Sequence, residues 1–164
     1  LDQLREQAME ASKALVKQGL ARHVGMSFHS RRAARRAIPD IDVMMIRYNI
    51  SMTDVERSVF SGLSADKSVD PGVVAFNVAH NGTYYFHKPP TGYPAGLYAP
   101  TIPDCYRFAL SNPWVDVVLA GFTKRSEIDE ALAMLDQGPL PAEEREFLCE
   151  YGSLFGLPTQ AIAS

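Results

Sequence analysis

Short runs of apolar residues alternate with helical patterns along most of this chain. Each run is followed by a polar corner and then by a helical pattern, an order typical of parallel strands joined by crossover helices. The runs are too apolar for a sheet with one solvated face, so we expect both faces to be covered. The predicted strands are 21–27, 42–49, 72–77 and 115–122.

The helical patterns begin and end at residues that favour helix boundaries. The first, 2–17, is followed by Gly19, which suits a left-handed cap, and Ser30 is a suitable N-cap for a helix over 31–38. Pro141 opens the last helix. The other predicted helices are 54–63, 102–110 and one that begins near Thr123 or Ser126. Two of these helices have an apolar face. In the first helix it consists of Leu4, Ala8, Ala11 and Leu15, and in the helix near Ser126 a face spaced as core consists of Ile128, Ala131, Leu132 and Leu135.

This order of elements predicts an α/β fold in which four parallel β/α units form half of a (β/α)₈ TIM barrel, with an extra C-terminal helix. At 164 residues the chain suits a single domain, 1–164. Half of a barrel leaves two open sheet edges. We therefore expect either a homodimer or an N-terminal half-barrel partner to cover them.

One connection, about 79–101, is much longer than the roughly 2 to 6 residues usual in such folds. It is rich in Gly, Pro and Tyr, which favours a packed lid over the carboxyl end of the third strand. Tyr84 and Tyr85 in this loop are candidate substrate-binding residues.

Composition excludes several kinds of partner. A net charge of -3 and a pI near 5.8 give no reason to expect a nucleic-acid surface. Cys105 and Cys149 have no nearby His or Cys at ligand spacing, so we expect reduced, buried or half-buried thiols and no metal site. No apolar stretch is long enough to cross a membrane, and we expect a cytoplasmic protein.

Candidate site residues follow the predicted strands, because parallel strands place their carboxyl ends on one rim. His29 and His80 could exchange a proton with a small-molecule substrate there, or could simply bind a loop carbonyl. Tyr48 is a further catalytic candidate, and Asn49 a substrate-binding one; the alternative is that both are core and turn residues.

Arginines give two further candidates. Arg47 alternates with Ile46 and Tyr48, so we expect it on the opposite face of its strand. There it could bind a carboxylate of a substrate or cofactor, or it could pair with Asp42 or another barrel acid. Four further arginines lie in one predicted helix: Arg31, Arg32, Arg35 and Arg36. They could bind a phosphate group, or their positive charge could be balanced by neighbouring acids or by solvent.

Several segments resemble one family in matching order over nearly the whole chain. They are GLARHVGMSFHS, IDVMMIRYNI, GVVAFNVA, RFALSNPWVDVVLAGFTKRSEIDEALAML and GPLPAEE. They are similar to the carboxyl-terminal half of the aldo/keto reductases. That resemblance implies a (β/α)₈ barrel oxidoreductase that uses NAD(P)H to reduce a carbonyl compound. The proton-donating tyrosine and its Asp, Lys and His partners belong to the family's amino-terminal half, to which nothing in this sequence corresponds.

The resemblance also implies positions for the cofactor. The family's Ser-Asn pair at the nicotinamide carboxamide falls on Ser27 and Phe28, its glutamine on Met45 and its stacking tyrosine on Phe76. Only Ser27 is identical; Phe76 retains an aromatic ring that can stack, whereas Met45 cannot make an amide hydrogen bond. Asn77 follows Phe76 and joins the cofactor-binding candidates.

In the last β/α unit, the segment with which the family binds the adenosine phosphate corresponds to residues 121–131. Thr123, Lys124 and Arg125 are cofactor-binding candidates there. Glu127 stands where the family has an arginine, and a carboxylate would repel a 2′-phosphate.

Two hypotheses follow. The chain could act in NAD(P)H-linked carbonyl reduction, with the catalytic acid supplied by an amino-terminal half or a partner chain. Alternatively, it could be a stand-alone, dimeric half-barrel that lacks hydride chemistry and serves as a small-molecule binding protein or as a cofactor-independent acid/base enzyme that uses rim His and Tyr residues.

Overall fold

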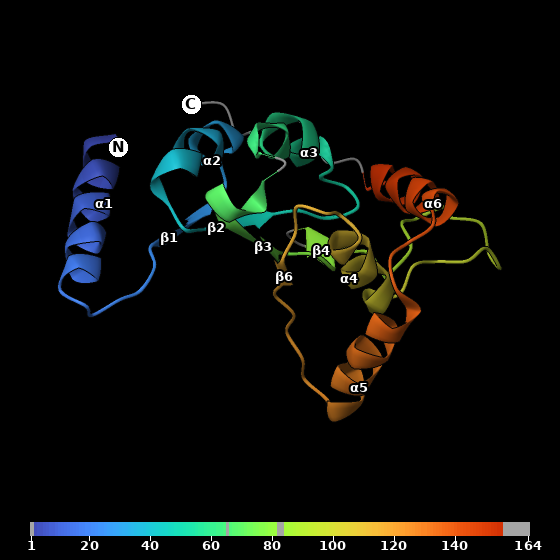
Figure 1. Cartoon of the computed structure of the whole chain (residues 1–164). Helices are drawn as coiled ribbons and strands as arrows, with labels where there is room; N and C mark the ends of the chain where they lie inside the picture. Colours follow the sequence, from blue (N-terminus) through green and yellow to red (C-terminus); the bar gives the residue numbers. More distant parts are fainter. Residues whose placement is uncertain (1, 65, 82–83, 156–164) are drawn as a thin grey trace.

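The structure, a computed structural model, describes residues 2–64, 66–81 and 84–155 (Figure 1). The helices are α1 (Asp2–Lys17), α2 (Arg31–Ala37), α3 (Asp54–Ser58), α4 (Ile102–Leu110), α5 (Arg125–Ala133) and α6 (Ala142–Ser153). The strands are β1 (Gly25–Phe28), β2 (Val43–Arg47), β3 (Gly72–Phe76), β4 (His80–Asn81), β5 (Tyr84–Tyr85) and β6 (Val117–Val118). Short 3₁₀ helices cover Ile38–Asp40, Phe60–Gly62, Lys67–Val69 and Met134–Gln137.

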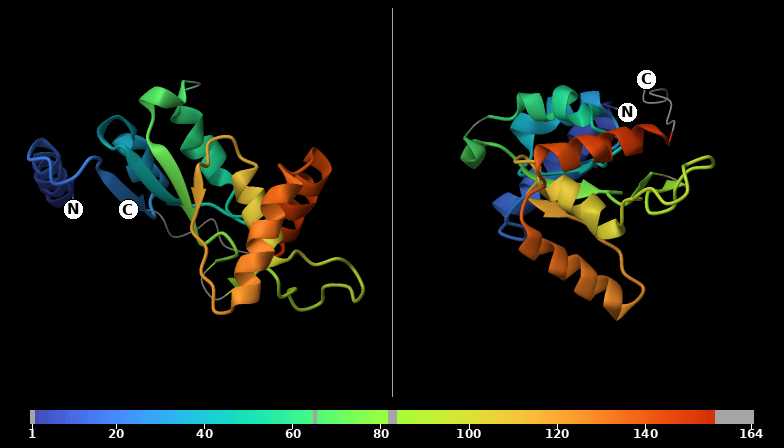
Figure 2. Two further views of the ribbon diagram at one scale, coloured as in Figure 1. Left: turned by 60° about the horizontal axis from the view of Figure 1, so that its bottom comes forward. Right: turned by 90° about the vertical axis from the view of Figure 1, so that its right-hand side faces the viewer.

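The predicted parallel sheet is confirmed. Its strand order is β1-β2-β3-β6, every neighbouring pair runs parallel, and the strands follow one another in sequence order (Figure 2). Ser27 lies beside Met45, and Arg47 lies beside Phe76. The four carboxyl ends therefore share one rim, which is where the sequence places the site.

The two faces of this sheet differ, contrary to the expectation that both are covered. Met44, Ile46, Val73 and Ala75 are buried on the side that helices cover. The alternate positions form what we call the open face, and they are half-buried or exposed: Ser27, Val43, Met45, Arg47, Val74 and Phe76. In a closed barrel these side chains would fill the interior, and four strands cannot enclose it. The apolar composition of the strands thus reflects a barrel interior that this half does not complete.

Helix α1 stands apart from the sheet, beyond the β1 edge (Figures 1 and 2). Ala8 and Ala11 are exposed and Leu15 is 46% exposed, so three residues of the apolar face predicted for this helix are open to solvent. An ion pair between Lys13 Nζ and Asp40 Oδ1, 3.2 Å apart, links the helix to the rest of the chain. Met9 of this helix is half-buried and packs against the core, whereas the apolar face with Ala8, Ala11 and Leu15 is exposed.

The opposite edge of the sheet is apolar and open as well. Leu132 and Leu135 on the α5 side are 57% and 55% exposed, so this predicted core face is also wrong, and Val117 of β6 is 48% exposed. Helix α5 packs on α4 and does not cover β6. Both open edges lie where a complete barrel would continue, as expected for half of one.

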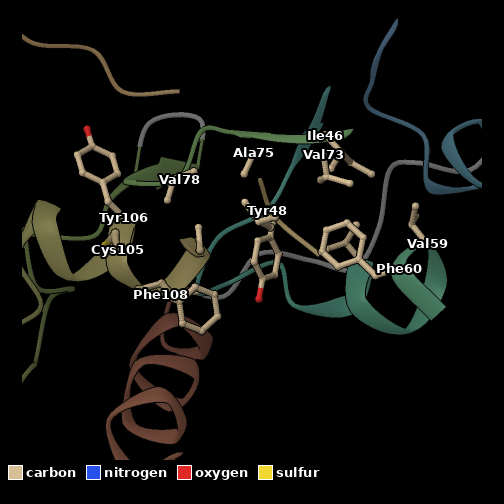
Figure 3. Close-up of a cluster of buried hydrophobic side chains, with 14 of the residues drawn as sticks. Ile46, Tyr48, Val59, Phe60, Val73, Ala75, Val78, Cys105, Tyr106 and Phe108 are labelled. Carbon is tan, nitrogen blue, oxygen red and sulfur yellow. The ribbon is translucent and has the colours of Figure 1, made fainter. Parts of the chain in front are cut away.

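The core lies between the sheet and helices α2, α3, α4 and α6 (Figure 3). Tyr48 occupies its centre, with its ring 5.5 Å from those of Phe60 and Phe108. A capping box fixes the start of α4, where Thr101 and Asp104 each bind the other's backbone N–H. Cys105 is buried, which raises the pKa of its thiol to about 12, and Cys149 is half-buried, as predicted.

The long loop, predicted to be a packed lid over the carboxyl end of the third strand, is packed, and its contacts are with α4 and α6. Tyr93 donates a hydrogen bond to the Tyr98 carbonyl at 2.7 Å, and its ring meets that of Tyr151 at 5.2 Å. Tyr98 donates to Asp104. These contacts hold the loop against α4 and α6.

No helix in the described part of the chain has both the length and the apolar character needed to span a bilayer. Nor do the described ranges contain a group of three or more His, Cys, Asp or Glu side chains placed to hold a metal ion.

Candidate functional site

Three predicted site residues meet at the rim and form what we call the rim cluster: His29, Arg47 and Phe76. They follow or end β1, β2 and β3, so three neighbouring strands each contribute one. Arg47 Nη2 lies 3.5 Å from His29 Nδ1, and the Arg47 guanidinium carbon lies 5.9 Å from the centre of the Phe76 ring. The His29 ring meets Phe76 edge-on at 5.6 Å. A cation, an imidazole and an aromatic ring are therefore within reach of one small ligand.

The rim cluster has a positive electrostatic environment. Burial and the nearby charge of Arg31 both lower the pKa of Arg47 from its ordinary value. Arg31 is held in place by Asp54 Oδ2, 3.2 Å from its Nε, and by the Arg47 carbonyl, 3.0 Å from its Nη1. Asp42, one of the acids suggested as a partner of Arg47, accepts a hydrogen bond from the Val24 N–H.

The carboxamide positions implied by the resemblance are only partly on the open face. Ser27 is exposed there, in register with Met45. Phe28 is 4% exposed and points to the helix side of β1, so it contributes to the core instead. Of these carboxamide positions, Ser27 alone has a hydrogen-bonding side chain, and its register neighbours on β2 and β3 are Met45 and Val74.

Asn49 and Asn77 shape the backbone that leaves the rim. Asn49 is fully buried, and its amide donates to the carbonyls of Asn77 at 2.9 Å and His80 at 3.3 Å. Asn77 has a φ of 54°, in the left-handed region that asparagine tolerates better than most residues. The side-chain amide of Asn49 thus stabilises the backbone that follows β3, and these hydrogen bonds occupy its N–H groups.

His80 stands in an aromatic group of its own after β3, the hairpin cluster of His80, Tyr85, His87 and Lys88. Tyr85 is 47% exposed, and its ring stacks on His80 at 5.2 Å and meets His87 at 5.8 Å. Lys88 Nζ lies 5.6 Å from the Tyr85 ring. The side chain of Tyr84 lies outside the described residues.

The segment after β6 borders an open groove of about 600 Å³ beside α5. Glu127 accepts hydrogen bonds from the N–H groups of Thr123 at 2.7 Å and Lys124 at 3.1 Å, and these bonds lower the pKa of its carboxyl. The Glu127 carboxylate thus caps the N-terminus of α5 by accepting hydrogen bonds from the backbone before the helix. The α5 groove is lined by Phe122, Thr123, Lys124, Arg125, Ile128, Asp129 and Leu132.

Tyr48 does not reach the rim, so its predicted position at the mouth is wrong. It is fully buried on the helix side, where its hydroxyl donates to Glu56 Oε1 at 2.5 Å and accepts from Asn112 Nδ2 at 3.1 Å. Arg145 Nη2 lies 2.5 Å from the same carboxyl oxygen. Burial and Glu56 both raise the pKa of Tyr48. Sequence reasoning missed this Tyr48 network, because its members come from four distant segments.

Solved structures with this architecture are aldo-keto reductases. The holo form of aldo-keto reductase AKR11C1 from Bacillus halodurans matches 89% of this chain with a TM-score of 0.65 and 16% identity, and the match covers 55% of that enzyme. Its apo form gives a TM-score of 0.59 over 89% of this chain and 56% of the enzyme, again at 16% identity. PA4992 from Pseudomonas aeruginosa, provisionally assigned to the same family, gives 0.53 at 18% identity, over 76% of this chain and 42% of its own.

The chain has the fold of about half an aldo-keto reductase. It spans about half the length of the two AKR11C1 structures, in agreement with the four strands and the two open edges. No protein-family model matches the sequence, and no curated protein matches it. The resemblance to aldo-keto reductases therefore rests on the fold, and the chemistry has to be argued from the residues.

Proposed function

We propose that this chain is the cofactor-binding half of an aldo-keto reductase-like oxidoreductase, which uses NAD(P)H to reduce a carbonyl compound. The observation that carries the proposal is the position of Phe76. Its ring lies on the open face at the carboxyl end of β3, one strand from Met45 and two strands from Ser27, where a nicotinamide ring can stack. Lys124 and Arg125 in the α5 groove supply positive charge for the phosphates of the cofactor.

The residues of this chain fit one half of such a site. Ser27 can hydrogen-bond a carboxamide and Phe76 can stack, whereas Met45 and Phe28 replace groups that would complete the contact. The cofactor would supply the hydride. The proton donor would come from an amino-terminal segment or from a partner chain, and His29 at the rim is placed to relay a proton to it.

The first test is a titration of NADH and NADPH fluorescence with the purified chain. We expect saturable binding, which Phe76→Ala weakens by about 3- to 10-fold because the stacking contact is lost. Phe76→Tyr is the matched control, since it keeps the ring, and should bind as the parent chain does. A flat titration at millimolar cofactor would reject the proposal.

A second function is favoured by the two open edges and by the substitutions at the carboxamide positions. A half-barrel without hydride chemistry would bind a small molecule, or act as an acid/base enzyme through His29 or His80, and would close its edges by dimerisation. Analytical ultracentrifugation tests this alternative, which predicts a concentration-dependent dimer because exposed Leu132 and Val117 would become buried. A monomer at all concentrations would contradict it.

A further inference from the structure

A small cavity lies at the opposite end of the sheet from the rim, and we call it the Trp114 cavity. It borders the amino-terminal ends of β3 and β6, because Gly72 begins β3 and Asp116 directly precedes β6. Its volume is about 170 Å³. Its uncharged lining consists of Leu63, Pro71, Gly72, Val73 and Trp114. The cavity is therefore separate from the proposed cofactor site.

The uncharged lining offers a mostly apolar wall. Leu63 and Val73 are 8% and 1% exposed, and both belong to the hydrophobic core. Trp114 is half-buried and packs against that core. Gly72 brings no side chain into the space. A protein cavity of roughly 150 Å³ can hold one benzene molecule, so the Trp114 cavity suits an apolar body of about that size.

The charged side chains at the same cavity carry one net negative charge, since they are Lys67, Asp70 and Asp116. Lys67 Nζ lies 2.9 Å from Asp116 Oδ1, and the other oxygen of Asp116 accepts the Val73 N–H at 2.8 Å. These contacts neutralise Lys67 and fix Asp116 in place. The carboxylate that remains is that of Asp70.

Asp70 is half-buried and follows the 3₁₀ helix Lys67–Val69. Its Oδ2 accepts a hydrogen bond from the Ser64 N–H, which holds the carboxylate at the cavity. Within the part of the chain that the structure describes, Asp70 forms no ion pair. A half-buried carboxylate attracts a cation more strongly than one in open water does. An ammonium ion at this position would complete the pairing.

We propose that the Trp114 cavity binds a small organic amine in its ammonium form, with an apolar body about the size of one benzene ring. The apolar body would lie against Leu63, Pro71 and Trp114, and the ammonium group would bind Asp70. An indole ring adds to the attraction, because the face of a tryptophan favours a nearby cation. This binding site goes beyond the proposed function and does not depend on it.

The test follows the fluorescence of Trp114, the only tryptophan in the sequence, while benzylammonium chloride is added to the whole chain at pH 7. We expect a saturable change with a dissociation constant in the millimolar range, because one ring and one ion pair are weak contacts. Benzyl alcohol is the matched neutral probe and should bind about 2- to 5-fold more weakly. No saturable change with benzylammonium, or equal affinities for the two probes, would overturn the proposal.

Two variants test the part played by charge. Asp70→Asn keeps an oxygen that can accept the Ser64 N–H but loses the charge, so it should bind benzylammonium about 2- to 5-fold more weakly and benzyl alcohol unchanged. Lys67→Met removes the competing cation and should bind benzylammonium about 2- to 5-fold more tightly. Asp136→Asn is the matched control, because Asp136 is an exposed aspartate outside the lining, and it should bind as the parent chain does.

Unchanged benzylammonium affinity in Asp70→Asn would overturn the proposal. If that variant fails to fold, Lys67→Met decides, and an affinity equal to or below that of the parent chain would overturn it. The cavity and the reductase fail separately. Benzylammonium binding with a flat cofactor titration would reject the reductase and keep the amine site, and cofactor binding without a Trp114 response would do the reverse.

Discussion

Gly152→Ala is expected to lower the free energy of unfolding by about 2 to 4 kcal/mol. Gly152 is buried in α6, where the helix lies against the chain that leaves β2. A Cβ atom at this position would lie 2.2 Å from the carbonyl oxygen of Ile50 and 2.9 Å from the Ser51 nitrogen. These are backbone atoms, so no change of rotamer relieves the overlap, and α6 or the loop has to move. Alanine also favours a helix by about 1 kcal/mol, which offsets part of the cost.

Urea unfolding followed by circular dichroism measures this effect, and Gly121→Ala is the control. A Cβ on Gly121 would have no neighbour within 4 Å, so its effect should stay within about 0.5 kcal/mol. If Gly152→Ala proves as stable as the parent chain, α6 does not approach Ile50 as closely as described. Because the Ser51 N–H bonds the buried Asn49 side chain at 3.1 Å, a shift there would also disturb the exit from β3.

The second large effect is expected at the centre of the core. Tyr48→Ala should lower the free energy of unfolding by about 3–5 kcal/mol. The ring of Tyr48 is fully buried between Phe60 and Phe108, so truncation leaves a cavity (Figure 3). Tyr48→Phe keeps the ring and removes the hydroxyl, which leaves Asn112 Nδ2 without that acceptor. Tyr48→Phe should lower the free energy of unfolding by about 1–3 kcal/mol.

Leu132→Ala provides the contrast in the same urea experiment. Leu132 is 57% exposed, so its truncation should cost less than about 1 kcal/mol. A loss of about 2–5 kcal/mol would mean that a second copy covers the α5 edge in solution. A loss below about 1 kcal/mol for Tyr48→Ala would show that Tyr48 is not the centre of the core.

Much of the fold was predictable because local signals and the global fold agree. Ser30 accepts a hydrogen bond from the Ala33 N–H as an N-cap, and Gly19 has the left-handed φ of 73° expected for a helix end. Glu143 and Glu144 lie in the first turn of α6. The strand predictions were longer than β1 and β6 as observed, because apolar runs continue past the last ladder hydrogen bond.

The candidate site was less predictable, since it depends on which face each strand buries. Alternation correctly separated Arg47 from Ile46 and Tyr48, but it does not say which of the two faces the helices cover. The position of Tyr48 at the rim was therefore wrong, and its partners Glu56, Asn112 and Arg145 could not be named from their spacing. The closeness of His29 to Arg47, at 3.5 Å, likewise comes from strand register alone.

By itself, the sequence determined the order of strands and helices, their parallel direction and the rim to which site residues belong, because hydrophobic periodicity, caps and crossover connections are local properties. The tertiary structure alone decided which apolar surfaces are covered. Leu15 and Leu132 have the spacing of core residues, yet they are exposed at two open edges. Burial depends on what stands opposite a side chain, and half of a barrel leaves these positions without a neighbour.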